Sequence, residues 1–189
     1  MSDNDDGNLQ WWQSLCTWYA VVLLILVVAF STKFTMSETT PSGTPEGTWY
    51  SKLSKPPGIP PNWVFGVVWG VLYILILAGV IIAAWDYHQV GSFPIMCFYT
   101  VILLMTMFWC FAFFQQHDPV LGSLILVSLL IVTGLMIWLL YPTTFTGAWF
   151  CESKSDIGWW EYLPFAFYIL FFIWICCATY FNIGVAIKN

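Results

Sequence analysis

The chain has 189 residues, of which 60% are apolar and only 8% are charged. Soluble domains are usually about half apolar and about one quarter charged, so this composition is typical of a membrane protein and excludes an ordinary water-soluble globule. Five basic residues, all lysines, face ten acidic residues, for a net charge of −5. Nucleic acid is excluded as a partner because phosphate contacts need clustered positive charge.

Five apolar segments are long enough to cross a bilayer, whose hydrocarbon core needs about 20 helical residues. In chain order, the predicted spans are about 12–30, 63–85, 94–114, 119–141 and 162–187. An acidic tail at residues 1–11 precedes them; it is unlike the basic start of a signal peptide, so we expect the first span to be retained. Asn62, Ser92 and Asp118 stand where helix N-caps belong. The predicted fold class is all-α, an integral membrane bundle of five transmembrane helices over residues 12–189.

The lysines are distributed unevenly between the two sides that five crossings create. Four of them fall on one side and one, Lys154, on the other; the four are Lys33, Lys52, Lys55 and Lys188. By the positive-inside rule, the first loop and the C-terminus are expected to be cytosolic.

The first loop, about Ser31 to Asn62, begins rich in serine and threonine and ends in a proline cluster. Each proline lacks an N–H and fixes its own φ, so we expect a stiff lid over one mouth of the bundle. The predicted lid residues are Trp49, Lys55, Pro56, Pro60 and Pro61. A simple proline stop before the second span is the alternative for Pro60 and Pro61. The linker 142–161, which contains Cys151, has no assigned role.

The chain lacks the residue clusters of a conventional enzyme or of a metal site. His88 and His117 are predicted in short loops at opposite ends of the bundle, so neither is expected to activate a nucleophile. The adjacent Cys176 and Cys177 point in different directions on a helix. We therefore expect no metal and no required cofactor.

Aromatic and small residues recur at four-residue spacing on three of the spans, so each set lies on one helix face. The sets are Phe65, Trp69 and Tyr73 on the second span, Met105, Trp109 and Phe113 on the third, and Trp174, Ala178 and Asn182 on the fifth. These faces can form either a packed core or the wall of a ligand cavity, and periodicity alone leaves both interpretations open. Gly66 and Gly70 form a G-x-x-x-G pair, which predicts the close approach of another helix.

Three motifs resemble the TspO/MBR family of translocator proteins, peripheral-type benzodiazepine receptors and tryptophan-rich sensory proteins. They are W-Y-x-x-L-x-K-P from Trp49 to Pro56, P-P-x-W-V-F from Pro60 to Phe65, and V-W-x-x-L-Y from Val68 to Tyr73. The third and fifth spans keep the family spacing at Trp109 and Phe113 and at Trp174, Ala178 and Asn182. Thr106 stands where the family usually has asparagine, which indicates a divergent member.

This resemblance implies a receptor-like membrane protein that binds porphyrins such as protoporphyrin IX, with sterols and benzodiazepine-type compounds as further ligand classes. The implied ligand-binding residues are Phe65, Trp69, Tyr73, Thr106, Trp109, Phe113, Trp174, Ala178 and Asn182. One alternative is an enzyme that degrades porphyrins in light through Trp69 and Trp174. Another is a lipophile transporter or scaffold that has no stoichiometric ligand.

The resemblance also implies partners and a location. The expected partners are membrane lipids, the porphyrin or another lipophilic molecule, and a second copy of the chain in a homodimer. Cys97 and Val101 stand where the G-x-x-x-G of family dimers lies. The expected membrane is the mitochondrial outer membrane or endoplasmic reticulum for a eukaryotic or viral source, and the cell envelope for a bacterial one.

Overall fold

The computed structural model of the protein describes residues 3–39, 47–86, 89–141 and 159–189. Five long helices dominate it: α1 (Asp3–Thr39), α3 (Asn62–Asp86), α4 (Gln89–Cys110), α5 (Pro119–Leu140) and α7 (Leu163–Lys188). All five are long and apolar enough to cross a membrane. The prediction of an all-α bundle with five transmembrane helices is confirmed.

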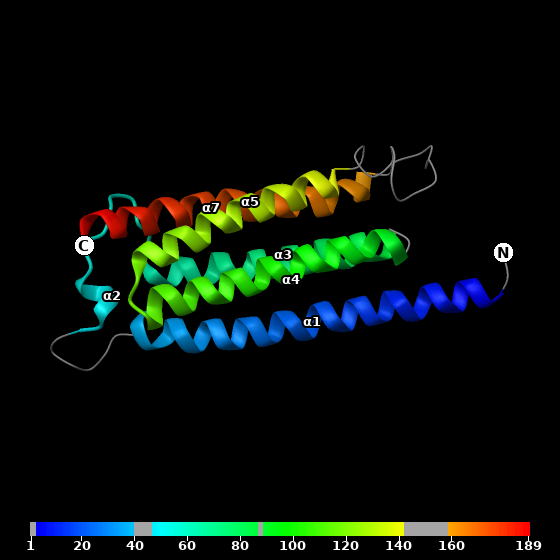
Figure 1. The fold of residues 1–189 in the computed structure, drawn as a ribbon, viewed down its shortest axis with the longest axis horizontal. Helices are drawn as coiled ribbons and strands as arrows, with labels where there is room; N and C mark the ends of the chain where they lie inside the picture. The colour runs from blue at the N-terminus through cyan, green and yellow to red at the C-terminus, as the bar shows by residue number, and fades with distance from the viewer. Residues whose placement is uncertain (1–2, 40–46, 87–88, 142–158) are drawn as a thin grey trace.

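Three short elements complete the described fold. They are the single-turn helix α2 (Trp49–Lys52), a π-helical turn at Phe111–Gln115 and a 3-10 turn at Trp159–Tyr162. The π turn continues α4, and α2 lies across one end of the bundle beside the C-terminus (Figure 1). We call this end the loop end.

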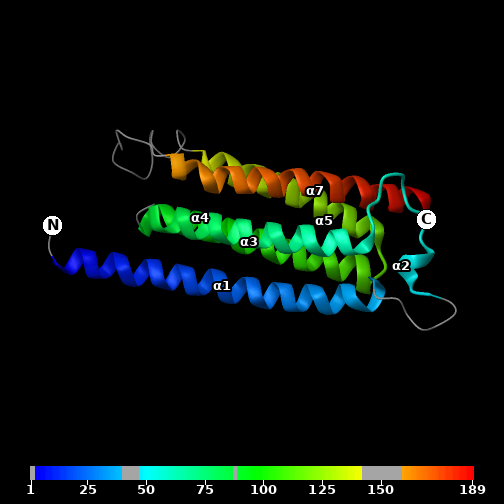
Figure 2. The same cartoon turned by 180° about the vertical axis from the view of Figure 1, so that it is seen from behind.

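The long helices form three layers. Helix α1 packs against α3 and α4 on one side, and α5 and α7 pack against that pair on the other side and against each other. The two opposite views agree on this order, with α3 and α4 between the outer layers (Figure 2). The C-terminal ends of α1, α4 and α7 and the N-terminal ends of α3 and α5 therefore meet at the loop end, which brings together residues far apart in sequence.

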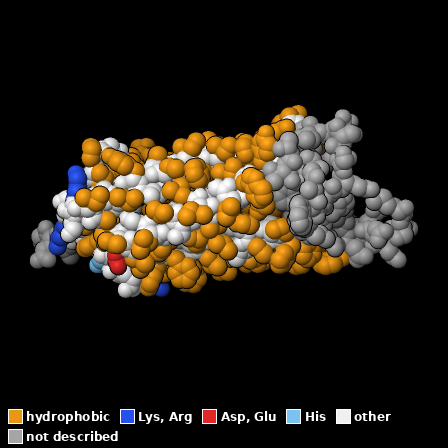
Figure 3. Space-filling view, turned by 45° about the horizontal axis from the view of Figure 1, so that its top comes forward, with side chains coloured by type: hydrophobic (Ala, Val, Ile, Leu, Met, Phe, Trp, Pro, Cys, Tyr) orange, Lys and Arg blue, Asp and Glu red, His pale blue; other side chains and the backbone are white. Residues whose placement is uncertain are grey.

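The face of the bundle seen in Figure 3 is largely apolar over its described part, and the lysine atoms in view lie at the loop end. Large side chains on the outer faces are strongly exposed, among them Ile25 at 61%, Ile74 at 66% and Ile131 at 62%. A helix bundle can present such a surface stably only to lipid. The protein is an integral, multi-pass membrane protein.

The structure corrects the predicted start and end of several helices. Helix α1 continues to Thr39, nine residues beyond the predicted end of the first span, and it begins at Asp3, inside the predicted tail. Its last turns stay helical because Thr35 and Thr39 donate hydrogen bonds to carbonyls of the preceding turn, so a Ser/Thr-rich segment that reads as loop is helix.

The three predicted N-caps have different outcomes. Asp118 is confirmed, since its side chain accepts hydrogen bonds from Val120 N and Leu121 N at 3.0 and 2.9 Å. Ser92 lies inside α4, which begins at Gln89, and Asn62 is already the first residue of α3. Those two predictions are wrong because Gln89 and Asn62 extend their helices toward the N-terminus.

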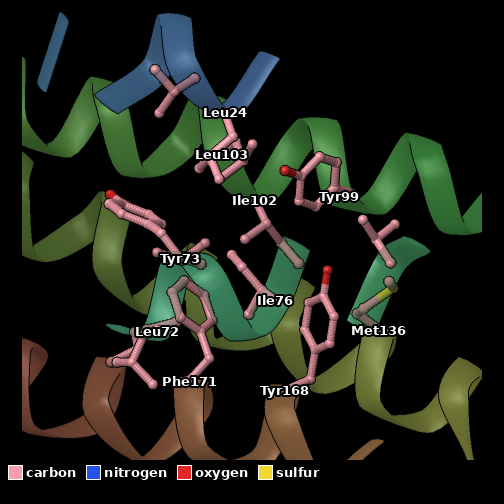
Figure 4. Packing of buried hydrophobic residues seen from close by; sticks show 14 of the residues in the cluster. Leu24, Leu72, Tyr73, Ile76, Tyr99, Ile102, Leu103, Met136, Tyr168 and Phe171 are labelled. Carbon is pink, nitrogen blue, oxygen red and sulfur yellow. The ribbon is translucent and has the colours of Figure 1, made fainter. Parts of the chain in front are cut away.

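The half of the bundle away from the loop end is closely packed. Ile76, Tyr99, Met136 and Tyr168 are completely buried where α3, α4, α5 and α7 meet, and Figure 4 shows them interlocked with Phe171. Tyr99 Oη donates a hydrogen bond to Ala20 O at 3.1 Å, which ties α4 to α1. This packing leaves the loop end as the part of the bundle in which a site is formed.

Candidate ligand-binding site

A cavity of about 350 Å³ lies inside the loop end of the bundle. Residues of α1, α3, α4 and α7 line it, and Tyr50 and Ile59 of the first loop also contribute. Its volume falls near the lower end of the range of about 300–1,000 Å³ that is typical of ligand pockets. None of the described residues that line it is charged, so the cavity offers apolar surface and neutral polar groups.

Aromatic rings form one wall of the cavity. Phe65, Trp69 and Tyr73 come from α3, and Trp109 comes from α4. The Trp69 ring lies 5.7 Å from Trp109 and 5.5 Å from Tyr73, with interplanar angles of 31° and 34°. Rings at these distances attract one another through offset contacts, so the stripes that periodicity placed on separate helices form one continuous aromatic surface.

The π-helical turn at the end of α4 adds two more rings to this wall. Gln116 N donates to Phe111 O at 3.1 Å, across five residues rather than four. This wider turn, of the kind often found at functional sites, allows the adjacent Phe113 and Phe114 both to line the cavity. Their rings meet edge to face at 4.9 Å.

Asn182 lies at the cavity but uses its hydrogen-bonding groups on the protein. Its Oδ1 accepts from Trp109 Nε1 at 3.0 Å, and its Nδ2 donates to Pro119 O at 2.7 Å and Ser123 Oγ at 2.8 Å. The side chain therefore joins α7 to α4 and α5. Since the indole N–H of Trp109 is used in this way, Trp109 presents its ring to the cavity rather than a donor.

The structure brings most of the predicted site residues to the cavity and leaves two behind its wall. Phe65, Trp69, Tyr73, Trp109, Phe113, Ala178 and Asn182 line it. Trp174 lies outside the lining and packs edge to face on Trp69 at 6.4 Å. Thr106 is completely buried and donates its hydroxyl to Ile102 O at 2.7 Å.

Gly66 and Gly70 also line the cavity. A Cβ atom built on either glycine meets no other atom within 4 Å. The prediction that this pair allows another helix to approach closely is therefore wrong. The two missing side chains leave open space between α3 and its neighbours, so these glycines contribute to the cavity rather than to a helix interface.

The lid is held from the α1 side by Glu38. Its carboxylate accepts from Tyr50 N at 3.3 Å and lies 3.4 Å from His117 Nε2. The His117 ring, on a residue with φ of 54°, stacks on Trp49 at 4.4 Å. Tyr50 and Phe113 rings meet at 6.1 Å. Helix α2 is thus fixed to the ends of α1 and α4, above the aromatic wall.

The proline part of the lid is held by the end of α7. Pro56 is buried, and a Cβ on Gly184 would come within 2.6 Å of its ring. Asn189 accepts from Ser54 N at 2.9 Å and donates to Ser54 O at 3.1 Å. The ammonium of Lys55 lies 3.9 Å from the centre of the Tyr50 ring. Burial lowers the pKa of Lys55 and raises the pKa of Tyr50.

The other predicted lid residues, Pro60 and Pro61, do not contribute to the cavity. Pro60 is half-buried and Pro61 is exposed, and neither lines the cavity, which Ile59 reaches instead. His88 and Cys151 lie outside the described residues. Within the described part of the chain, no group of three His, Cys, Asp or Glu side chains is placed to hold a metal ion.

Sequence reasoning missed the wall that α1 contributes. Four hydroxyl residues near the end of this helix line the cavity, namely Ser31, Thr32, Thr35 and Thr39. They fall in the segment that the sequence predicts as the first loop, where no helix face is expected. Their spacing is a signal that could have identified them, because positions 31, 35 and 39 repeat every four residues and share one helix face.

These features define a polytopic helical membrane protein with an internal aromatic cavity of ligand-pocket size. The chain belongs to the TspO/MBR family, whose model matches residues 20–187. Protein CrtK of Rhodobacter capsulatus is 29% identical over 140 residues, which are 74% of this chain and 77% of that protein. The tryptophan-rich protein TspO of Archaeoglobus fulgidus is 27% identical over 171 residues, 90% of this chain and 95% of that protein.

Proposed function

We propose that the protein is a membrane receptor that binds flat lipophilic molecules of the porphyrin class in the cavity beneath the lid. The observation that supports this most strongly is the convergence of Trp69, Trp109 and Phe113 on one cavity. A flat conjugated ring gains about 0.5–1.5 kcal/mol for each good aromatic contact beyond the burial of area. Family membership supports a binding role in general, and the aromatic wall supports this class of ligand.

The lid has a defined part in this proposal. The cavity is small for a macrocycle with several substituents, so we expect α2 and the proline segment to move outward when a porphyrin binds. Lys55 and Lys188 lie at this end, with Lys188 Nζ donating to Lys55 O at 3.2 Å. Porphyrin carboxylates would remain at this mouth, near the lysines, because the lining itself has no charge to pair with them.

Protoporphyrin IX titration with tryptophan quenching tests the proposal. Trp69→Ala should weaken binding about tenfold or more, because Trp69 contacts both Tyr73 and Trp109 at the centre of the wall. Trp174→Ala should weaken it less, since Trp174 lies behind Trp69. Trp138→Ala is the matched control, because Trp138 is 60% exposed on the outer face of α5. Equal affinities in all three variants would contradict the site.

Light-dependent porphyrin breakdown is the second candidate. It is favoured by the contacts of Trp69 with Trp109 at 5.7 Å and with Trp174 at 6.4 Å, since indoles in contact with a bound porphyrin are oxidisable by it in light when oxygen accepts the electron. Illumination of the complex under air and under argon separates the two candidates. A new absorbing product that needs light, oxygen and Trp69 supports the enzyme, and a stable complex under air supports the receptor.

Three further expectations belong to this proposal. The loop end faces the cytosol, because Lys33, Lys52, Lys55 and Lys188 gather there. The protein is expected in the mitochondrial outer membrane, the endoplasmic reticulum or a bacterial envelope, according to its source, and as a homodimer. Cysteine accessibility from each side of sealed vesicles tests the orientation, and crosslinking in nanodiscs tests the dimer.

A further inference from the structure

Ser31 differs from most hydroxyl residues of the long helices. Most of these donate a hydrogen bond to the carbonyl four residues earlier, as do Thr17, Thr35, Thr39, Thr100, Thr106, Ser123, Ser128 and Thr179. Ser31 is only 7% exposed, and its Oγ has no hydrogen-bond partner among the described residues. A buried hydroxyl without a partner lowers stability and requires an explanation.

The position of Ser31 gives that explanation. Five buried side-chain polar atoms lack a partner within the described ranges, on Trp12, Ser31, Thr133, Tyr168 and Trp174. Of these five residues, Ser31 alone lines the cavity. The Cys110 thiol lies beside it and interacts with the Ser31 side chain, but the geometry is not that of a formed hydrogen bond, and a thiol is a weak partner for a buried hydroxyl.

The neighbouring threonines on α1 differ from Ser31 in the hydrogen bonds that they can offer to a ligand in the cavity. Thr35 and Thr39 donate their hydroxyl protons to Ser31 O and Thr35 O, at 3.0 and 2.8 Å, so their oxygens can only accept from a ligand. Ser31 Oγ is able both to donate and to accept. This polar wall on α1 lines the same cavity as the aromatic wall on α3 and α4, and the described lining is uncharged.

We infer that Ser31 is the centre of a polar subsite that selects ligands with an uncharged hydrogen-bonding group, such as a hydroxyl or N–H, on the edge of a flat ring system. The ring lies against the aromatic wall, and its polar edge pairs with Ser31 Oγ and with the acceptor oxygens of Thr35 and Thr39. A carboxylate at this position is disfavoured because its charge would be buried without a cation. The inference rests on the proposed function in using the same cavity.

Three small fluorescent probes test the subsite in purified protein in nanodiscs of neutral lipid. Pyrene supplies the flat ring alone, 1-hydroxypyrene adds one hydroxyl, and 1-pyrenecarboxylate adds one negative charge. Affinity is measured from energy transfer from tryptophan. When one probe is compared between variants, its partitioning into lipid cancels; when two probes are compared, each affinity is corrected for the partitioning of that probe into empty nanodiscs.

In Ser31→Ala, the affinity for 1-hydroxypyrene should fall about three- to tenfold, the usual range for one lost hydrogen bond, and the affinity for pyrene should not change. Thr133→Val is the matched control, because Thr133 is also buried without a partner but does not line the cavity; neither affinity should change in it. In the unchanged protein, 1-pyrenecarboxylate should bind at least about tenfold more weakly than 1-hydroxypyrene.

Equal loss of pyrene and 1-hydroxypyrene in Ser31→Ala, or no loss of either, would overturn the subsite while the proposed function stands. Tighter binding of the carboxylate than of the hydroxyl probe would overturn the selection for uncharged ligands. If no probe binds in a manner that depends on Trp69, both the subsite and the proposed site fail.

Discussion

Helix α3 passes through two different environments, and the comparison shows what forms the cavity. In its first half, Gly66 and Gly70 face open space. In its second half, Ile76 and Val80 are completely buried, and a Cβ on Gly79 would meet Pro164 Cα at 3.4 Å. Both halves are almost entirely apolar. Hydrophobicity therefore does not distinguish the cavity from the core; the difference lies in what packs against each glycine.

The sharpest test of this comparison is the same substitution in both halves. Gly79→Leu should destabilise the protein by about 3 kcal/mol, because its Cβ would already touch Pro164, Phe167 and Tyr168 and the rest of the side chain would have to enter filled space. Gly70→Leu should keep the unfolding free energy close to that of the parent, since a Cβ there meets nothing. It should instead reduce protoporphyrin affinity about tenfold or more by filling the cavity.

Unfolding in detergent and porphyrin titration on both variants provide the two measurements. If Gly70→Leu unfolds as easily as Gly79→Leu, the first half of α3 is packed as closely as the second half, which would contradict the comparison. Full retention of binding in Gly70→Leu would place the ligand elsewhere.

The second test concerns the polar group that holds the cavity half together. Asn182→Ala removes three hydrogen bonds and leaves Trp109 Nε1 buried without a partner. We expect a loss of at least about 2 kcal/mol in unfolding free energy, since three such bonds in membranes, at about 0.6 kcal/mol each, already give that sum and the orphaned donor adds to it. Asn62→Ala is the control, because Asn62 is exposed and makes a single long bond of 3.5 Å to Thr39 O. Equal stability of the two variants would contradict this role.

The sequence is sufficient to predict the helices that cross the membrane and the aromatic face of α3. The spans follow from uninterrupted apolar runs, and the shared face follows from four-residue spacing at Phe65, Trp69 and Tyr73. Whether that face packs as core or lines a cavity does not follow from the spacing. The sequence is insufficient for the α1 wall, because serine and threonine, as at Ser31 and Thr35, are typical of loops and are also accommodated in helices, where their hydroxyls can bond to the preceding turn.

Two further features depend on three-dimensional contacts that no local pattern contains. The G-x-x-x-G pair at Gly66 and Gly70 predicts a helix interface. Whether another helix fills the space beside the two glycines depends on the position of α1, which the sequence of α3 does not contain. Trp174 shares a stripe with Ala178 and Asn182, and yet it packs against Trp69 and does not line the cavity. Periodicity shows which face of a helix a residue lies on, but not whether that residue reaches the cavity or packs behind another side chain.

The smallest predicted effect concerns the contact that holds the lid, where the cavity half meets water. Glu38→Gln keeps an oxygen that can accept from Tyr50 N but removes the charge that faces His117 at 3.4 Å. The histidine side chain is 43% exposed, and ion pairs in such settings contribute less than about 1 kcal/mol. Overall stability should therefore not change measurably. The amides of α2 should exchange with deuterium about two- to fivefold faster, since opening of the lid alone becomes easier.

Lys52→Gln is the matched control, because it removes an exposed charge from α2 that faces no acidic group among the described residues. Faster exchange in the packed half as well would mean that the lid and the core open together, and the two halves of the bundle would then be one cooperative unit.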